Sequence, residues 1–348
     1  MSSIKDFRFK SEPKEPTPID EVELIGLDTK TTKSAIDEIN PICEGVKFAR
    51  ELVSAPPNFL TPYQMSKEAE KLATDYDLDL KVLDRKECEN QGMGAYLAVA
   101  KGSDLEPNFI HLKYSPKTAI KKIVLIGKGL TFDSGGYNLK VGASQIEKMK
   151  YDMGGSASVL GTARAIAELK PSNTEVHFIV AACENMINGS ALHPGDIIKA
   201  SNGKTIEVNN TDAEGRLILA DALTYAGESD PDLIVSMATL TGAARVAVGQ
   251  DLAPFFAGTQ KNAMALMTSS ETAKDPVWQL PFWDPYDKLI EPQIADLDNA
   301  PSGGFAGSIT AALFLRRFVE EPEKYIHFDI YSWQQNAGVL GPKGAITQ

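Results

Sequence analysis

Short runs rich in β-branched and aromatic residues alternate with helical runs along most of this chain, and this alternation constrains the fold more than any other feature. Several of the short runs are apolar throughout, which is typical of strands covered by helices on both faces. The predicted strands are 78–83, 109–114, 122–127, 175–183, 233–240 and 325–333, and the predicted helices are 154–169, 216–227 and 308–319. The pattern predicts an α/β fold with three layers: a largely parallel or mixed central sheet with helices on both faces.

The first 40 residues have a different character. They are polar and contain three closely spaced prolines, and only residues 22–27 have the composition of a strand. We predict that residues 1–40 form a polar N-terminal tail or linker. Helical spacing begins at Pro41. The predicted organisation is therefore a tail over 1–40 followed by one folded domain over 41–348.

Composition and charge argue against several classes of protein. The 348 residues carry a formal net charge of −12, and because nucleic-acid binding normally needs a basic face, we expect no nucleic-acid partner. No run approaches the roughly 18–20 apolar residues that cross a bilayer, so we expect no membrane association. The first residues lack the apolar core of a secretory signal, which predicts a cytoplasmic protein and leaves a processed organellar form open. The three cysteines form no Cys-x-x-Cys pair, which argues against a thiolate zinc site.

Three segments concentrate acidic and basic side chains. They are "IGKGLTFDSGGYNLK" (126–140), "MKYDMGGSASVLGTARAIAEL" (149–169) and "NNTDAEGRLILADAL" (209–223). In open α/β sheets, ligands lie beyond the carboxyl ends of the strands, and the first segment follows such a strand. Together the segments supply Asp133, Asp152, Asp212 and Glu214, with Lys128, Lys140 and Arg216.

Four carboxylates in one cleft repel one another unless cations compensate them, and two divalent metals about 3.5–4 Å apart are the usual solution. None of the four histidines lies in these segments. A histidine-rich mononuclear zinc site is therefore disfavoured, and an oxygen-dominated binuclear site remains open. Taken singly, each residue also has a structural explanation, such as a surface turn for Asp212 and Glu214 or a helix cap for Asp152. Their joint occurrence favours the metal site.

The segments "GKGLTFDSGG", "KYDMGGSAS" and "NNTDAEGRLILADAL" resemble the leucyl aminopeptidase (cytosol aminopeptidase) family, whose signature octapeptide is "NTDAEGRL". The resemblance continues in the same order through "PGDIIKASNGKTIEV", "ATLTGA" and "GGFAGSITAALFLRRF". It implies that residues 41–348 form an aminopeptidase catalytic domain that releases N-terminal amino acids from peptides, with a leucine-like preference. The family's separate N-terminal domain has only the tail over 1–40 in its place.

The resemblance also implies the metal ligands. Asp133 and Glu214 would bridge two divalent ions, Lys128 and Asp152 would complete one site, and Asp212 would serve the other. The family usually takes Zn²⁺, and Mn²⁺, Co²⁺ or Mg²⁺ can occupy one position. The two ions would activate a water for attack on the peptide bond.

Further roles follow from the same resemblance. Asp152 would hold the substrate's free amino group, and Lys140 would stabilise the oxyanion. Arg216 would anchor a bicarbonate ion that serves as general base, helped by the backbone near Leu240. The specificity pocket would be lined by Met149, Thr239, Leu240, Gly242, Ala213 and the segment 331–334.

The resemblance implies a homo-hexamer that acts on small peptides. Two alternatives remain open at this point. One is a catalytically weak or non-enzymatic relative that acts as a scaffold or binding protein. The other is a serine hydrolase, because "FDSGG" places Ser134 in a sequence similar to that around trypsin-like nucleophiles, although such a site also needs a histidine base.

Overall fold

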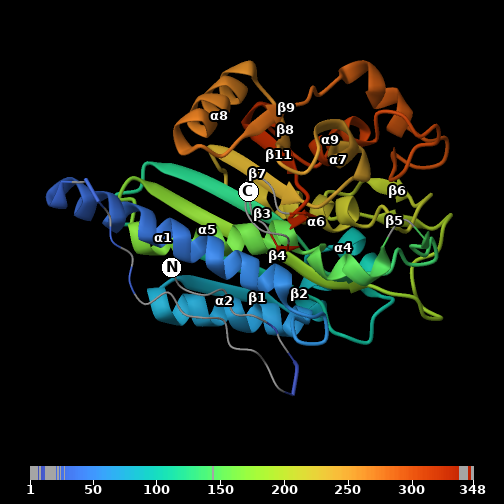
Figure 1. Ribbon diagram of the computed structural model, residues 1–348. Helices are drawn as coiled ribbons and strands as arrows, with labels where there is room; N and C mark the ends of the chain where they lie inside the picture. The colour runs from blue at the N-terminus through green and yellow to red at the C-terminus, as the bar shows by residue number, and fades with distance from the viewer. Residues whose placement is uncertain are drawn as a thin grey trace.

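The computed structural model describes residues 28–142, 145–336 and 344–345, together with 7, 9–11, 21, 23 and 25–26. Its centre is an eight-stranded sheet in the order β1-β2-β4-β3-β7-β11-β8-β9 (Figure 1). The strands are β1 (Asp79–Leu83), β2 (Asn108–Tyr114), β3 (Lys121–Asp133), β4 (Thr174–Asn185), β7 (Leu233–Ala238), β8 (Ala253–Ala257), β9 (Val277–Gln279) and β11 (Tyr325–Asp329).

The four central strands, β4, β3, β7 and β11, are parallel. The pairs β1–β2, β2–β4 and β8–β11 are antiparallel, and β9 runs parallel to β8. The sheet is therefore mixed with a parallel centre, as predicted. Two small sheets lie beside it: β5 (Ile197–Lys199), β6 (Thr205–Glu207) and β10 (Leu297–Asp298) form one, and β12 (Trp333–Gln334) and β13 (Gly344–Ala345) form the other.

Helices cover both faces of the sheet, which confirms the three-layer prediction. The helices are α1 (Thr29–Ser54), α2 (Pro62–Tyr76), α3 (Arg85–Asn90), α4 (Gly94–Ala100), α5 (Gly154–Leu169), α6 (Gly215–Gly227), α7 (Gly242–Val248), α8 (Gln260–Ala273) and α9 (Gly307–Arg316). Three short 3₁₀ helices are η2 (Ile146–Tyr151), η3 (Asp284–Ile290) and η4 (Pro322–Lys324). None of these helices is long and apolar enough to cross a membrane.

The two faces bury separate hydrophobic cores. On one face α2 and α5 pack against the sheet, and α1 packs on α5 (Figure 1). On the other face α4, α6 and α9 bury the larger core. The contact between α1 and α5 is close because glycines meet there: a Cβ on Gly45 would lie 2.5 Å from the carbonyl oxygen of Gly161. Any larger side chain at this crossing would push the two helices apart.

The predicted elements match the structure in the middle of the chain, except that β3 continues to Asp133 instead of ending at residue 127, and they differ further toward both ends. Helix α5 has the predicted bounds of 154–169. Helix α1 begins at Thr29 and continues through Pro41, so the predicted boundary at residue 41 falls inside a helix. Of the strand predicted over 22–27, only residues 23, 25 and 26 are described, and 25–26 form a turn.

The strand predicted over 325–333 is also too long. Strand β11 ends at Asp329, and the chain resumes a short strand only at Trp333. Ser332 has a φ of 60°, which a β-strand cannot accommodate. The break lies beside the site described next.

Candidate metal centre and substrate pocket

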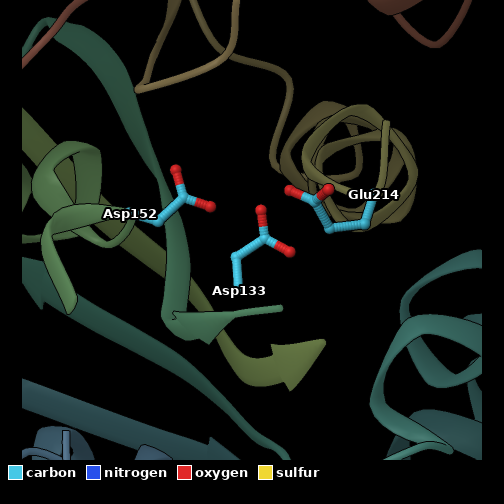
Figure 2. A group of neighbouring side chains, drawn as sticks. All are labelled: Asp133, Asp152 and Glu214. Carbon is cyan, nitrogen blue, oxygen red and sulfur yellow. The ribbon is translucent and has the colours of Figure 1, made fainter. Parts of the chain in front are cut away.

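Three segments that are distant in the sequence meet at the carboxyl end of the parallel strands. Asp133 is the last residue of β3, Asp152 follows η2 just before α5, and Glu214 immediately precedes α6. Figure 2 shows the three carboxylates pointing toward one another, with Asp133 between the other two. One carboxylate oxygen from each lies within 4.8 Å of the others, and all three side chains are buried. This arrangement is the one predicted for the ends of the parallel strands.

Lys128 lies deep in the site and is 3% exposed. Its Nζ is 2.9 Å from Asp152 Oδ2 and 2.9 Å from Glu214 Oε1, and it donates a hydrogen bond to the Thr239 carbonyl at 3.0 Å. Burial disfavours the ammonium, but Asp152 and Glu214 outweigh that cost and raise the pKa of Lys128 above its usual value. Lys128 reaches its partners because residue 215 is a glycine, where a Cβ would lie 2.7 Å from Lys128 Nζ.

Lys140 forms the second bridge. Its Nζ is 2.8 Å from Asp133 Oδ2 and 2.5 Å from Asp212 Oδ1. Burial again opposes the charge, and Asp133 is the first of the carboxylates that keep the pKa of Lys140 above normal. Lys140 therefore links Asp212 to the three clustered carboxylates Asp133, Asp152 and Glu214, and Asp212 itself lies outside that cluster. All five predicted metal-ligating residues and Lys140 lie in one site.

Burial and mutual repulsion raise the pKa values of two of the carboxylates. Burial is the main cause that raises the pKa of Asp152, and the charges of Asp133 and Glu214 add to it although Lys128 opposes them. Burial and the charge of Glu214 likewise raise the pKa of Asp212. The negative charge of the four carboxylates is thus larger than the positive charge of the two lysines.

The donor set fits divalent metals. Glu214 Oε2 is buried and accepts no hydrogen bond from any residue that the structure describes. A buried carboxylate oxygen without a donor is costly, and a cation would satisfy it. Carboxylate oxygens with one amine suit Mn²⁺, Mg²⁺ and Zn²⁺, whereas a soft, thiolate-seeking metal would find no ligand here.

Neighbouring side chains orient the carboxylates. Asn185, at the end of β4, donates from Nδ2 to Asp133 Oδ1 at 2.8 Å. Thr239 Oγ1 donates to Asp152 Oδ1 at 2.7 Å. Asn185 was not among the predicted site residues, although it comes two residues after the end of the predicted strand 175–183, where ligand-binding residues are expected. Such partners fix which oxygen is free to bind a cation.

Asp329 is another residue that the sequence analysis missed. It is buried at the end of β11 and accepts hydrogen bonds from the backbone N–H groups of Leu240 and Thr241 at 3.1 and 2.9 Å. It also accepts from the hydroxyls of Thr241 and Ser308. This carboxylate therefore fixes the loop between β7 and α7, which forms one wall of the site.

A pocket of about 210 Å³ opens onto the carboxylates. Of the residues predicted to bind substrate, Met149, Asp152, Thr239, Leu240 and Gly242 line it, whereas Ala213 is not among its lining residues. The remaining walls are Gln145, Tyr151, Thr241, Arg245, Ile330 and Tyr331, of which only Tyr331 lay in a segment predicted for the pocket.

Arg216 lies behind the site and does not line the pocket. It is 8% exposed, and its Nη1 donates to the carbonyl oxygen of Asn299. Burial lowers the pKa of Arg216 to about 10, although Glu214 favours its charge. Its Nε has no hydrogen-bond partner among the described residues. One donor of the guanidinium is therefore left for a further acceptor.

Ser134 is not placed as a nucleophile. Its hydroxyl donates to the Asn185 carbonyl at 2.8 Å and accepts from the backbone N–H of Gly136 at 3.1 Å. Neither partner is a base. The serine hydrolase alternative lacks the histidine that it needs within the described residues.

Comparison with known proteins agrees with this geometry. Residues 47–347 match the model of the cytosol aminopeptidase family, catalytic domain. Two proteins described as probable cytosol aminopeptidases from Prochlorococcus marinus strains are 55% and 56% identical over 349 residues, which covers 99% of this chain and 70% of each relative. A third, from a Synechococcus strain, is 53% identical with the same coverage. This chain belongs to the cytosol aminopeptidase family, a family of metal-dependent exopeptidases.

Proposed function

We propose that this chain releases N-terminal amino acids from peptides and that its five clustered ligands hold two divalent metal ions. The observation that carries the proposal is the excess of buried carboxylate over lysine charge, with Glu214 Oε2 left without a donor. Asp133 and Glu214 would bridge the ions, with Lys128 and Asp152 on one and Asp212 on the other. We assign Zn²⁺ or Mn²⁺ to the sites, with Co²⁺ or Mg²⁺ as substitutes.

The chain's own residues then do most of the positioning. When bound, the ions polarise the scissile carbonyl and acidify a water. A buried carboxylate oxygen of Asp152 binds the substrate's α-ammonium group, which restricts cleavage to the first residue. The Lys140 ammonium donates a hydrogen bond to the oxygen on which negative charge develops. In the metal-loaded site Lys128 serves as a neutral amine, because adjacent dications reverse the effect that the carboxylates have on its pKa.

Arg216 supports a general base. Its unpartnered Nε leaves a donor for a bicarbonate ion, which would take the proton from the attacking water. The Leu240 N–H, which was expected to help, already donates to Asp329 Oδ1 at 3.1 Å. The anion is therefore assigned to the guanidinium.

We also propose that residues 41–348 act as the catalytic domain, in the cytoplasm and as a homo-hexamer. Size-exclusion chromatography with light scattering tests the assembly. A monomeric mass at micromolar concentration would contradict the hexamer and leave the assignment of the metal site intact.

The test of the function is hydrolysis of Leu-p-nitroanilide by the metal-loaded chain. A chelator should abolish hydrolysis, and Mn²⁺ or Zn²⁺ should restore it. Metal quantitation should find about two ions per chain. Fewer than one ion per chain after loading would refute the binuclear site, and binding of ions without hydrolysis would favour the scaffold alternative.

A further inference from the structure

Arg245 lies in the wall of the pocket without a role in the proposed chemistry. It is on α7, and its guanidinium carbon is 4.5 Å from the centre of the Tyr331 ring. Its Nη2 lies 3.9 Å from the point where a Cβ on Gly242 would be. Gly242 and Arg245 are three residues apart on one helix and so share a face. The guanidinium therefore lies at the part of the pocket assigned to the first side chain of the substrate.

The charge of Arg245 is not compensated. Lys128 and Lys140 are each held by two carboxylates. Within the described residues, Arg245 forms no ion pair with an acidic side chain, and its guanidinium contacts the aromatic residues Tyr151 and Tyr331. A cation–π contact attracts the guanidinium to the ring and leaves its charge in place. Arg245 is the pocket cation that can still bind an anion.

The stack on Tyr331 orients the guanidinium. Tyr331 is 7% exposed, packs edge-on against Tyr151 and accepts a hydrogen bond from Gln335 at its hydroxyl. A ring held in this way restricts the plane of the guanidinium, which donates one hydrogen bond to the Tyr151 hydroxyl and keeps further N–H donors for a ligand. The planar fork of an arginine matches a carboxylate with two parallel hydrogen bonds.

Metal binding changes the net charge of the rest of the site, so that a substrate with an acidic side chain is no longer repelled. With Lys128 as a neutral amine, the four carboxylates and the Lys140 ammonium leave three negative charges. Two divalent ions reverse the sign of this charge. A substrate carboxylate would then meet a positive site on one side and Arg245 on the other.

We propose that Arg245 is a specificity-determining residue that selects peptides beginning with aspartate or glutamate. The inference rests on the proposed aminopeptidase function and names its substrate class. The α-ammonium group of such a substrate binds at Asp152, and its side-chain carboxylate binds the guanidinium edge of Arg245. The ring of Tyr331 limits the room for a bulky apolar side chain.

The experiment measures kcat/KM of the metal-loaded chain on Glu-, Asp-, Leu- and Lys-p-nitroanilide. Arg245→Met keeps the length of the side chain and removes its charge. It should lower the ratio of kcat/KM for Glu over Leu by roughly tenfold or more, as expected for the loss of a hydrogen bond between charged groups. Arg245→Glu should reverse the preference toward Lys. Arg164→Met removes an arginine of α5 outside the pocket and should leave the Glu-to-Leu ratio as it is.

Three results would overturn the inference. A wild-type preference for Leu, with a Glu-to-Leu ratio that Arg245→Met does not change, would refute it and leave the aminopeptidase function standing. The kcat/KM for Leu-p-nitroanilide could instead rise in both Arg245→Met and Tyr331→Ala while kcat/KM for Glu-p-nitroanilide stays unchanged. This result would show that Arg245 and Tyr331 only limit the size of the pocket. If the metal-loaded wild-type chain hydrolysed none of the four substrates, the proposed function and the inference would both fail.

Discussion

Two polar networks, one buried and one partly buried, lie on neighbouring strands of the same sheet and differ in how completely their polar atoms are hydrogen-bonded. At the carboxyl end of β3 is the carboxylate site, defined here as Asp133, Asp152, Glu214 and their two lysines. Toward the amino end of β4 is a histidine chain, defined as His111, His177 and Glu175. The first network contains a buried oxygen without a donor, and the second contains none among its described atoms.

The histidine chain is complete by itself. His111 Nδ1 is 3.1 Å from the Tyr225 hydroxyl, and its Nε2 is 2.9 Å from His177 Nδ1. His177 Nε2 is 2.9 Å from Glu175 Oε1, and Ser115 donates to the other oxygen. Every ring nitrogen therefore has a partner. The comparison teaches that a satisfied buried network needs only the fold to explain it, whereas an unsatisfied network calls for a ligand.

Removal of one carboxylate from each network tests this comparison most directly. Glu214→Gln should reduce hydrolysis of Leu-p-nitroanilide by more than about a thousandfold, because a shared ligand of both ions is lost. Bound metal, counted by mass spectrometry, should fall below two ions per chain. Glu175→Gln is the matched control and should keep both activity and metal. Equal losses in the two variants would show that Glu214 matters only for folding.

Lys140→Ala separates catalysis from metal binding. The loss of a donor to the developing oxyanion should lower kcat by roughly 10²–10³-fold, with metal content preserved. Steady-state kinetics and metal quantitation on the same sample measure the two effects. If the variant lost its metals together with its activity, Lys140 would be needed to assemble the site, and its assignment to the oxyanion would be wrong.

Metal loading should stabilise the protein, because only the folded chain brings the carboxylates together. At a free metal concentration one hundred times the Kd, the free energy of unfolding should rise by about 2.7 kcal/mol. Urea denaturation with and without Mn²⁺ measures this. The metal-induced rise in the free energy of unfolding should be smaller in Glu214→Gln and unchanged in Glu175→Gln. The absence of a gain in the wild type would contradict the idea that cations complete the carboxylate site.

The histidine chain should respond to acid instead of metal. Burial and then the charge of His177 lower the pKa of His111 from 6.5 to about 4. Above pH 6.5 both the folded and the unfolded states hold His111 neutral, and below it only the unfolded state takes up the proton. The free energy of unfolding should therefore decrease as the pH falls from 7 to 5, by about 2 kcal/mol from this group.

Urea denaturation at pH 7, 6 and 5 tests this effect against His111→Gln, in which the titrating group is absent. The wild type should lose more stability than the variant over this range, since other groups titrate in both proteins. Parallel curves would show that His111 does not contribute.

The sequence identified the site in outline. Seven charged residues of the three segments were predicted to form one site, and the structure places six of them around one pocket, whereas Arg216 does not line it. Asn185 and Arg245 were not predicted, because nothing local distinguishes an asparagine at a strand end or an arginine on a short helix. Their positions depend on β3 lying beside β4 and on α7 following β7.

The sequence by itself determined the α/β class, helix α5 and the chemical types of the proposed metal ligands, because periodicity and local motifs are properties of neighbouring residues. Only the tertiary structure decided which lysine bridges which carboxylates, that strand β11 stops at Asp329 and is followed by a positive φ at Ser332, and that Arg245 meets Tyr331. These features join residues far apart in the chain, and their energies depend on burial and distance, which a linear pattern does not contain.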